Sequence, residues 1–418
     1  MRWTALLFLA AAGACSSDGV APPIGQDDAG ETVFDDAATA PDAAADDAAE
    51  PQGSPPTAVI SADPIDGQAP VVVHFDGSGS SDPDGDLSTL SWDFGDSTSA
   101  EGATVEHTYD RPGSFHVLLT VTDSRGTTGT ATVEVRVTLA DCPTFARGVS
   151  RGFLGSNAPT LPDLLIEVSG MVASRRATDL LWVHNDSGDG PRIYAINDHG
   201  AVRAGYELVG AQAVDWEDIT IGPGPTAGVD YIYVGDIGDN QRGSDIALVY
   251  RIPEPTNVPA PTAMPSLFRV RTVETIVLEY GGGRAFNAES MMVDPRNGDL
   301  YIVTKSDTGV SKVFRAAAPL NAGAQTLLED LGNLIIGGEA TGADIAPSGE
   351  IVIRTYQAAQ VFRRPPGLSV NDALHQPSCL VRLANEMQGE SISYSSDGLG
   401  LWSTTEGMGP FLYFYARQ

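Results

Sequence analysis

Short runs of alternating apolar and polar residues, separated by Gly, Asp, Asn and Pro, extend over most of the chain beyond residue 55. Typical runs are VVVHF at 71–75 and FHVLLTV at 115–121. Alternation over four to eight residues between turn residues predicts half-buried β-strands. Helical periodicity is weak, above all beyond Cys142. The pattern therefore predicts an all-β protein.

Beyond residue 142, five segments can be aligned with one another. Each has a small or acidic pair that opens a first strand, then a turn, a second strand, a polar turn and a third strand with an aromatic residue. The openings are Ser169-Gly170, Glu217-Asp218, Glu289-Ser290, Thr341-Gly342 and Glu390-Ser391. They recur roughly every fifty residues, a spacing typical of the four-stranded blades of a β-propeller. We expect five blades over residues 140–418, with a six-bladed ring as the alternative.

The fifth segment lacks a fourth strand, because the sequence ends at Gln418. Residues 145–154 precede the first opening and have no place in the first blade. We expect them to supply the missing strand and so to join both ends of the domain. This closure would bring Cys142 towards Cys379, and a pair of cysteines in an exported protein favours a disulfide. Two separate thiols are the alternative.

The N-terminus carries an export signal. Arg2 is followed by an apolar run, too short to span a bilayer, and by small residues before Cys15. The stretch AGAC resembles a bacterial lipobox, although Ala12 stands where a lipobox usually has Leu. The resemblance implies a signal peptide at 1–14 and lipidation of Cys15, which would anchor the protein to a membrane facing the periplasm or the cell exterior. An ordinary secretory signal is the alternative.

The acidic charge of the chain is concentrated near its N-terminus. The formal net charge is -31, and residues 16–56 contain eight Asp and two Glu with no Lys or Arg. Few large apolar residues occur there, so we expect a disordered tether over 15–54. No basic face is visible along the chain, which excludes nucleic acid as an expected partner.

Residues 55–139 contain a specific set of motifs. They are Trp92-Asp93-Phe94-Gly95-Asp96, His107-Thr108-Tyr109, and Pro112-Gly113 followed by LLTVTD. The segment resembles the PKD domain, an immunoglobulin-like β-sandwich, and the resemblance implies a spacer or an adhesive module. Asp82, Asp84 and Asp86 could bind calcium, but the turn chemistry of Asp-Pro-Asp-Gly explains them equally well.

Propeller geometry predicts where the polar residues of the repeats meet. The first strand of each blade lines the channel, and the next strand runs antiparallel to it. Starts of first strands and ends of second strands therefore lie at one mouth. We expect the first group to contribute Glu217, Asp218, Glu289, Asp344 and Glu390. We expect the second group to contribute His184, Asn185, Asp186, Asp236, Asp239, Lys305, Arg354 and Glu406.

Several carboxylates at one axis suit a hard cation, because calcium takes six to eight oxygen ligands. We expect Glu217, Glu289, Glu390 and Asp344 to be its ligands. Strand capping without a metal is the alternative. Lys305 and Arg354 would pair with the acids or bind an anionic group of a ligand. We expect Asn185, Asp186, Asp236, Asp239 and Glu406 to contact the same ligand.

Three functions remain open at this point. The first is a lipid-anchored surface protein that binds an extracellular small molecule, glycan or protein at an acidic mouth. The second is a calcium-dependent hydrolase of phosphate esters or nucleotides, with Asp218 or His184 as general base; one acid per blade is similar to the calcium-dependent nucleotidases, at the level of fold only. The third is a scaffold for protein–protein interaction.

Overall fold

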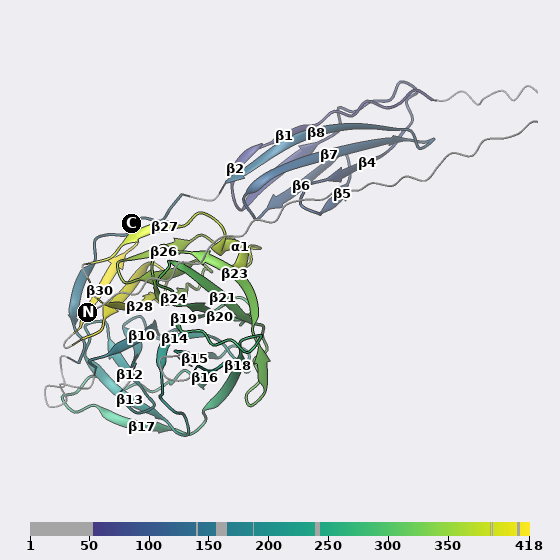
Figure 1. Cartoon of the computed structure of the whole chain (residues 1–418). Coiled ribbons are helices and arrows are strands. Elements are labelled where there is room, and N and C mark those ends of the chain that lie inside the picture. Colours follow the sequence, from purple (N-terminus) through teal and green to yellow (C-terminus); the bar gives the residue numbers. More distant parts are fainter. Residues whose placement is uncertain are drawn as a thin grey trace, which may run out of the picture. The chain divides into compact units, whose positions relative to one another are not determined.

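The computed structural model describes residues 53–138, 141–155, 165–186, 188–238, 243–384, 386, 388–407 and 410–418. The expected signal peptide, Cys15 and nearly all of the expected tether lie outside these ranges. The described residues form β-strands and loops, with one short helix, α1 (Val370–Leu374). None of the helices in this part of the chain has both the length and the apolar character required to cross a membrane. The protein is all-β, as predicted (Figure 1).

The first β-structure, up to residue 138, consists of two sheets with the strand orders β1-β3-β6 and β2-β8-β7-β4-β5. The strands are β1 (Ser61–Asp63), β2 (Asp66–Gln68), β3 (Val71–Asp76), β4 (Leu87–Asp93), β5 (Ser99–Glu101), β6 (Thr104–Tyr109), β7 (Gly113–Asp123) and β8 (Thr128–Thr138). Phe75, Trp92 and Val117 belong to the buried core between the two sheets. The indole of Trp92 donates a hydrogen bond to the Gly102 carbonyl at 2.8 Å. Buried and exposed residues alternate along β3 and β7, which accounts for the alternating apolar and polar residues of these segments in the sequence.

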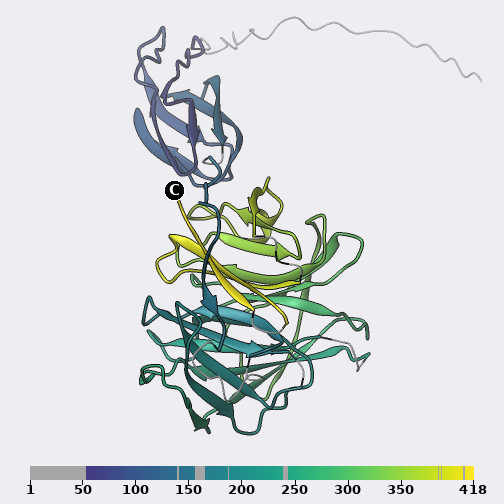
Figure 2. The ribbon, with the colours of Figure 1, turned by 90° about the vertical axis from the view of Figure 1, so that its left-hand side faces the viewer.

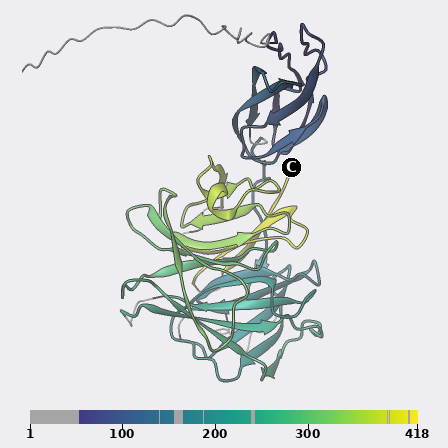
Figure 3. The same ribbon diagram turned by 90° about the vertical axis from the view of Figure 1, so that its right-hand side faces the viewer.

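Residues 141–418 form five further sheets, which follow one another along the chain (Figure 3). The innermost strands are β10 (Val168–Ala173), β14 (Trp216–Pro223), β19 (Ala288–Val293), β24 (Ala340–Ile345) and β28 (Gly389–Tyr394). The second strands are β11 (Leu180–Asn185), β15 (Asp230–Asp236), β20 (Leu300–Thr304), β25 (Ile351–Thr355) and β29 (Gly400–Thr405). The third strands are β12 (Arg192–Asn197), β16 (Ile246–Pro253), β21 (Val310–Ala316), β26 (Ala358–Phe362) and β30 (Phe411–Ala416). The five openings in the sequence coincide with the innermost strands.

The fourth strands are β13 (Val202–Leu208), β18 (Glu274–Glu279), β23 (Glu329–Ile335), β27 (Cys379–Arg382) and β9 (Val149–Phe153). As predicted, β9 comes from the segment before the first repeat and pairs with β30 in the fifth sheet (Figure 2). Two additional strands were not predicted. β17 (Ser266–Val270) and β22 (Gln325–Leu327) pair in parallel with β13 and β18 as fifth strands of the first two sheets.

The innermost strands contact one another in cyclic order, β10 with β14, β14 with β19, β19 with β24, β24 with β28, and β28 with β10. Hydrogen bonds join these strands. The Ser169 hydroxyl donates to the Glu217 carbonyl at 2.6 Å, and the Ser391 hydroxyl donates to the Ser169 carbonyl at 2.6 Å. The Thr341 hydroxyl donates to the Gly389 carbonyl at 2.7 Å. The small polar residues of the openings therefore hold neighbouring sheets together.

Every innermost strand has a β-bulge at the same position. The register with the second strand shifts between Val168 and Gly170, and at the equivalent point in the other four sheets. The residues at the bulges are Ser169, Glu217, Glu289, Thr341 and Glu390. A bulge leaves its extra residue unpaired and changes the direction of its side chain, which makes it a frequent feature of functional sites. Three of these five bulges carry a glutamate.

Apolar side chains of adjacent sheets pack against each other between these strands. Trp182 from the first sheet and Trp216 from the second belong to one buried cluster and are completely buried. Met291 lies in a second such cluster, between the second and third sheets. The innermost strands are therefore buried at every position except the last residue of β14, although they carry polar residues.

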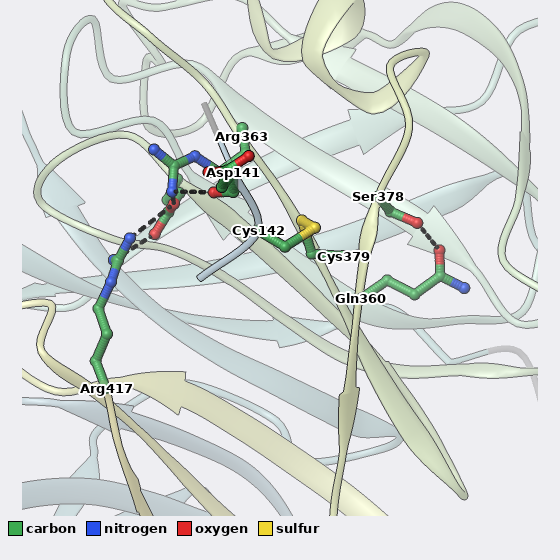
Figure 4. Close-up of a disulfide and its surroundings, with 8 residues drawn as sticks. Asp141, Cys142, Gln360, Arg363, Ser378, Cys379 and Arg417 are labelled. Carbon is green, nitrogen blue, oxygen red and sulfur yellow. Dashed lines mark hydrogen bonds and ion pairs between the residues drawn. A yellow bond between two sulfur atoms is a disulfide. The ribbon is translucent and has the colours of Figure 1, made fainter. Parts of the chain in front are cut away.

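A disulfide joins Cys142 to Cys379, across a sequence separation of 237 residues (Figure 4). It connects the segment that enters the domain to β27, as predicted. Nearby, Glu350 accepts from Arg363 at 3.1 Å and from Arg417 at 2.7 Å, and the Arg363 guanidinium donates to the Asp141 carbonyl at 3.4 Å. The entering segment and the C-terminal strand are therefore fastened to the fourth sheet by covalent and ionic contacts.

Candidate functional site

Six carboxylates define what we call the acidic cluster, and all come from the same end of the sheets. They are Asp186, Asp215, Glu217, Glu289, Glu390 and Glu406. Asp186 and Glu406 directly follow second strands, whereas Glu217, Glu289 and Glu390 lie at the starts of innermost strands. This is the distribution that the antiparallel rule predicts.

Asp186, Asp215 and Glu217 form the tightest part of the cluster. One oxygen from each of these side chains lies within 4.8 Å of the others. Glu217 Oε1 and Asp186 Oδ1 are buried and have no hydrogen-bond partner among the described residues. A Cβ atom on Gly238 would lie 2.4 Å from Glu217 Oε1 and 2.5 Å from Asp215 Oδ2, so a side chain at this position would displace the two carboxylates. Three converging carboxylate oxygens, with unpartnered oxygens on Asp186 and Glu217, suit a hard divalent cation.

Electrostatics in this part of the cluster disfavours the ionised carboxylates in the absence of a cation. Burial, and then the charge of Asp215 and Glu406, raise the pKa of Asp186 to about 7. Burial and the neighbouring Glu289 raise the pKa of Glu217 well above its ordinary value. Both shifts arise because water is excluded and like charges are close. A bound cation would offset both effects, because its positive charge stabilises the ionised carboxylates.

Lys305 is the positive charge inside the acidic cluster. Its ammonium group donates to Glu289 Oε1 at 2.5 Å and to the Tyr356 hydroxyl at 2.7 Å. The Lys305 side chain retains 22% of its exposure, whereas that of Glu289 retains 7%. Hydrogen bonding to Glu289 and Tyr356 raises the pKa of Lys305 despite the opposing effect of burial. Lys305 is therefore charged at neutral pH and accessible from solvent.

Glu390 and Glu406 form the part of the cluster nearest to the fifth sheet. Gly389 pairs with Thr405, which places the two glutamates at adjoining strand ends. Glu390 is 6% exposed, and burial, Glu289 and Glu406 raise its pKa to about 8. Glu406 is half-buried and accepts one hydrogen bond from the Gln388 amide at 3.3 Å. Burial and Glu167 also raise the pKa of Glu406.

The structure corrects the roles expected for two aspartates. Asp218 is 1% exposed, and its carboxylate accepts from the backbone amides of Ile219 at 2.8 Å, Met291 at 2.7 Å and Ala343 at 3.3 Å. It joins three innermost strands and is not placed as a general base. Asp344 accepts from Ile345, Ser393 and Tyr394 in the same manner, so its oxygens are not available to a metal held by Glu217.

The structure also corrects the role expected for Arg354, which is structural and not ligand-binding. It is completely buried and donates to the carbonyls of Ser391 at 2.8 Å and Thr404 at 3.3 Å. Its guanidinium forms an ion pair with Glu386 at 2.9 Å. A Cβ atom on Gly389 would lie 1.6 Å from Arg354 Nη2, which explains the glycine at the start of β28. Arg354 therefore binds the fourth sheet to the fifth.

His184 and Asp236 lie at the predicted strand ends but are completely buried. His184 Nδ1 donates to the Asn185 carbonyl at 2.9 Å, and burial lowers the pKa of His184 to about 4. Asp236 Oδ1 accepts from the Asp215 amide at 3.0 Å and so positions a member of the cluster. Neither side chain reaches solvent, which argues against His184 as a catalytic base and Asp236 as a direct ligand contact.

Asn185 and Asp239 are the two remaining residues that were predicted to bind a ligand. The Asn185 amide donates to Asp189 Oδ2 at 3.2 Å and is 5% exposed, so it supports the hairpin beside the cluster. Asp239 lies outside the described residues.

The sequence pattern assigned no role to Asp215, Tyr356 and Gly238. For Asp215 a signal was present, because residues two positions apart lie on the same side of an extended chain, and Asp215 is two positions before Glu217. Tyr356 and Gly238 stand in loops, where periodicity gives no information about the direction of a side chain.

A second group of carboxylates lies in the first β-structure. Asp82, Asp86 and Asp123 each place an oxygen within 4.8 Å of the others, and Asp82 Oδ2 and Asp86 Oδ1 are buried without a partner among the described residues. Asp84, expected in this set, is replaced by Asp123. The Asp84 carboxylate instead accepts from the Ser54 amide at 2.7 Å and lies 3.8 Å from Arg125.

Residues 53–137 match the profile of the PKD domain family, so the first β-structure is a PKD domain. Collagenase ColA of Clostridium perfringens is 38% identical over 65 residues, which are 16% of this chain and 6% of the collagenase. The PKD1 domain of Vibrio anguillarum Epp is 29% identical, with a TM-score of 0.19, over 21% of this chain and all of that domain. The chain thus spans less than a tenth of the collagenase.

The five-sheet domain has more distant structural neighbours. The gluconolactonase XC5397 from Xanthomonas campestris is 14% identical, with a TM-score of 0.37, over 66% of this chain and 95% of that enzyme. At this identity and TM-score the likeness carries no argument about activity.

Proposed function

We propose that the protein is an exported surface protein in which a five-bladed β-propeller binds a ligand at a calcium-holding acidic cluster, with the PKD domain as spacer. The observation that carries the proposal is the convergence of Asp186, Asp215 and Glu217, together with the unpartnered buried oxygens of Asp186 and Glu217. Cyclic contacts between the innermost strands support the propeller. The disulfide is consistent with export. Anchoring through a lipid on Cys15 is part of the proposal.

Binding is favoured over hydrolysis of phosphate esters for a structural reason. The hydrolase hypothesis needs a general base and cations that receive the phosphate. Asp218 and His184 are buried, and the Arg354 guanidinium is committed to Glu386 and backbone carbonyls. Lys305 remains, but it already neutralises Glu289. The remaining accessible groups are acids, which suit a cation better than a phosphate.

Calcium is expected to raise the melting temperature of the five-sheet domain by about 5 to 10 °C at a hundredfold excess over its Kd, because only the folded state holds the three ligands together. Glu217→Gln and Asp215→Asn should each abolish most of this rise. Differential scanning calorimetry and isothermal titration calorimetry of the full chain measure the effect.

The PKD domain requires its own control, since we also propose a calcium site at Asp82, Asp86 and Asp123. The titration is therefore repeated in a background that carries Asp82→Asn and Asp86→Asn. Glu207→Gln, which changes a half-buried glutamate paired with the exposed Arg269, serves as the matched control and should leave binding unchanged. If calcium still binds the Glu217→Gln variant in this background with unaltered affinity, the proposed site is wrong.

The stabilisation by calcium should also depend on pH. Asp186 and Glu390 have pKa values of about 7 and 8 in the folded protein, which lie above the ordinary values. Protonation of such groups therefore stabilises the fold at low pH, and this contribution is lost as the pH rises through 7 and 8. Without calcium, we expect the melting temperature to fall between pH 5.5 and pH 8.5. With calcium the fall should be much smaller, and equal slopes with and without calcium would contradict the assignment.

A further inference from the structure

A cavity of about 290 Å³ lies between the third and fourth sheets, at the end opposite to the acidic cluster. Its lining residues come from the turn between β19 and β20, from β20, β21 and β23, and from the segment that leads into α1. The turn after an innermost strand and the turn after a second strand lie at opposite ends of an antiparallel sheet, so the cavity is separate from the acidic cluster. Ligand sites usually enclose about 300 to 1,000 Å³, and this cavity therefore has room for one small molecule.

The charged side chains in the wall of this cavity are already paired with one another. Arg364 donates to both carboxylate oxygens of Asp294, at 2.8 and 2.6 Å, and both side chains are buried. Arg315 donates to Asp299 at 2.8 Å and to Glu329 at 2.9 Å. A charged ligand would compete with these pairs, and separation of the buried pair would leave a charge without its partner. The cavity therefore suits an uncharged ligand.

Tyr301 supplies a polar group in the cavity that the protein leaves without a partner. It is 4% exposed, and its hydroxyl forms no hydrogen bond with any described residue. Burial and the nearby Asp299 raise the pKa of Tyr301 to about 12, so the hydroxyl keeps its proton at neutral pH. Buried polar groups of folded proteins are nearly always hydrogen-bonded. The Tyr301 hydroxyl can therefore donate a hydrogen bond to a molecule in the cavity and accept one from it.

Asn371 supplies a second unused group, from the fourth sheet's side of the cavity. Its side-chain amide forms no hydrogen bond within the described ranges, and the amide oxygen, Oδ1, is buried. The amide nitrogen carries two N–H donors. Glu329 adds an acceptor at the rim, since its side chain is 58% exposed and also lines the cavity. Donors and acceptors from two sheets thus border one cavity.

We propose that this cavity binds an uncharged polyhydroxylated molecule, a single pyranose sugar, between Tyr301 and Asn371. Each hydroxyl of a sugar both donates and accepts. One ligand can therefore accept from the Asn371 amide, donate to Glu329 and exchange a hydrogen bond with Tyr301. The sugar is either a free monosaccharide or the terminal unit of a glycan. This site goes beyond the function proposed above and does not depend on calcium.

Saturation-transfer NMR of the full chain with D-glucose, D-galactose and D-mannose tests the inference, with D-glucuronate and D-glucosamine as charged analogues. We expect at least one neutral sugar to bind, and to bind more tightly than either analogue. Disaccharides that carry this sugar at one end then distinguish the two sources. Equal or tighter binding of a disaccharide identifies the end of a glycan, and weaker binding identifies a free monosaccharide. Failure of all three neutral sugars to bind, or tighter binding of a charged analogue, overturns the proposal.

Two matched variants make the test specific. Tyr301→Phe removes only the hydroxyl and should weaken sugar binding at least tenfold. It should leave the melting temperature unchanged or raise it, because this hydroxyl has no partner in the protein, whereas a structural role would lower it. Tyr206→Phe is the control, since Tyr206 is 5% exposed, has an unpartnered hydroxyl and lies in the cluster between the first and second sheets. It should leave sugar binding unchanged.

Sugar binding should also be the same in calcium and in EDTA, which separates failure of this inference from failure of the calcium site. Asn371→Ala should weaken sugar binding in the same direction as Tyr301→Phe. Equal sugar affinity of the Tyr301→Phe variant and the unmodified protein overturns the proposal.

Discussion

Replacing Cys142 and Cys379 together by serine is expected to destabilise the five-sheet domain by about 5 kcal/mol and to lower its melting temperature by about 10 °C or more. The bond closes a sequence separation of 237 residues, and the entropy that a crosslink removes from the unfolded chain grows with the length of the loop. Calorimetry measures the change, with the transition of the PKD domain as an internal reference.

Reduction of the unmodified protein provides the control for this prediction. A reductant should lower the melting temperature of the five-sheet domain to that of the double serine variant and should have no effect on that variant. The ion pairs of Glu350 with Arg363 and Arg417 remain after reduction, so the domain should still fold (Figure 4). If removal of the disulfide lowered the free energy of unfolding by less than about 1 kcal/mol, these ion pairs and the β9–β30 pairing would already fix the entering segment. That result would contradict the entropic argument.

Arg354→Met is expected to destabilise the same domain by about 3 to 5 kcal/mol, because it leaves Glu386 buried without its counter-ion. Both side chains of this ion pair are almost completely buried. Among the described residues, the Glu386 carboxylate would then have the Ser403 and Tyr415 hydroxyls as its donors, at 2.6 and 3.1 Å. Denaturant unfolding monitored by the fluorescence of the buried tryptophans measures the loss.

Two comparisons show whether burial causes this effect. Arg269→Met removes an exposed partner of Glu207 and should cost less than about 1 kcal/mol. The double variant Arg354→Met, Glu386→Gln should recover part of the stability, since neither charge then remains buried alone. Equal losses for Arg354→Met and Arg269→Met would show that Arg354 is not the structural residue that its contacts indicate.

Patterns that repeat along the chain predicted most of the fold. The alternation in the PKD domain and the five openings follow from burial on one or both faces of a strand. The position of β9, which is mostly exposed, followed from the missing fourth strand of the fifth repeat. The fifth strands β17 and β22 were missed because they are short and exposed on most positions, so burial leaves little pattern in them. β17 comes from the long Pro-rich connection after β16, where local sequence does not reveal the sheet that a strand joins.

The position of the candidate site was predicted better than the roles of its residues. Antiparallel strand order correctly brought Glu217, Glu289 and Glu390 to one end of the sheets. It could not distinguish side chains that face solvent from side chains that bond to the neighbouring sheet. Asp218 and Arg354 illustrate the difficulty, because their partners are backbone groups of strands far away in sequence. Only the packing of the sheets decides which polar residues are already satisfied.

The pairing of β9 with β30 has a consequence for biosynthesis. β9 leaves the ribosome before any other strand of the five sheets and, under the export proposed above, also crosses the membrane first, while its partner β30 follows the other strands of those sheets. Throughout translocation, an edge strand with exposed Val149 and Phe153 must therefore wait for the rest of the domain. Unpaired edges of this kind invite aggregation, so holdase chaperones in the receiving compartment should matter more for this protein than for one whose sheets close in sequence order.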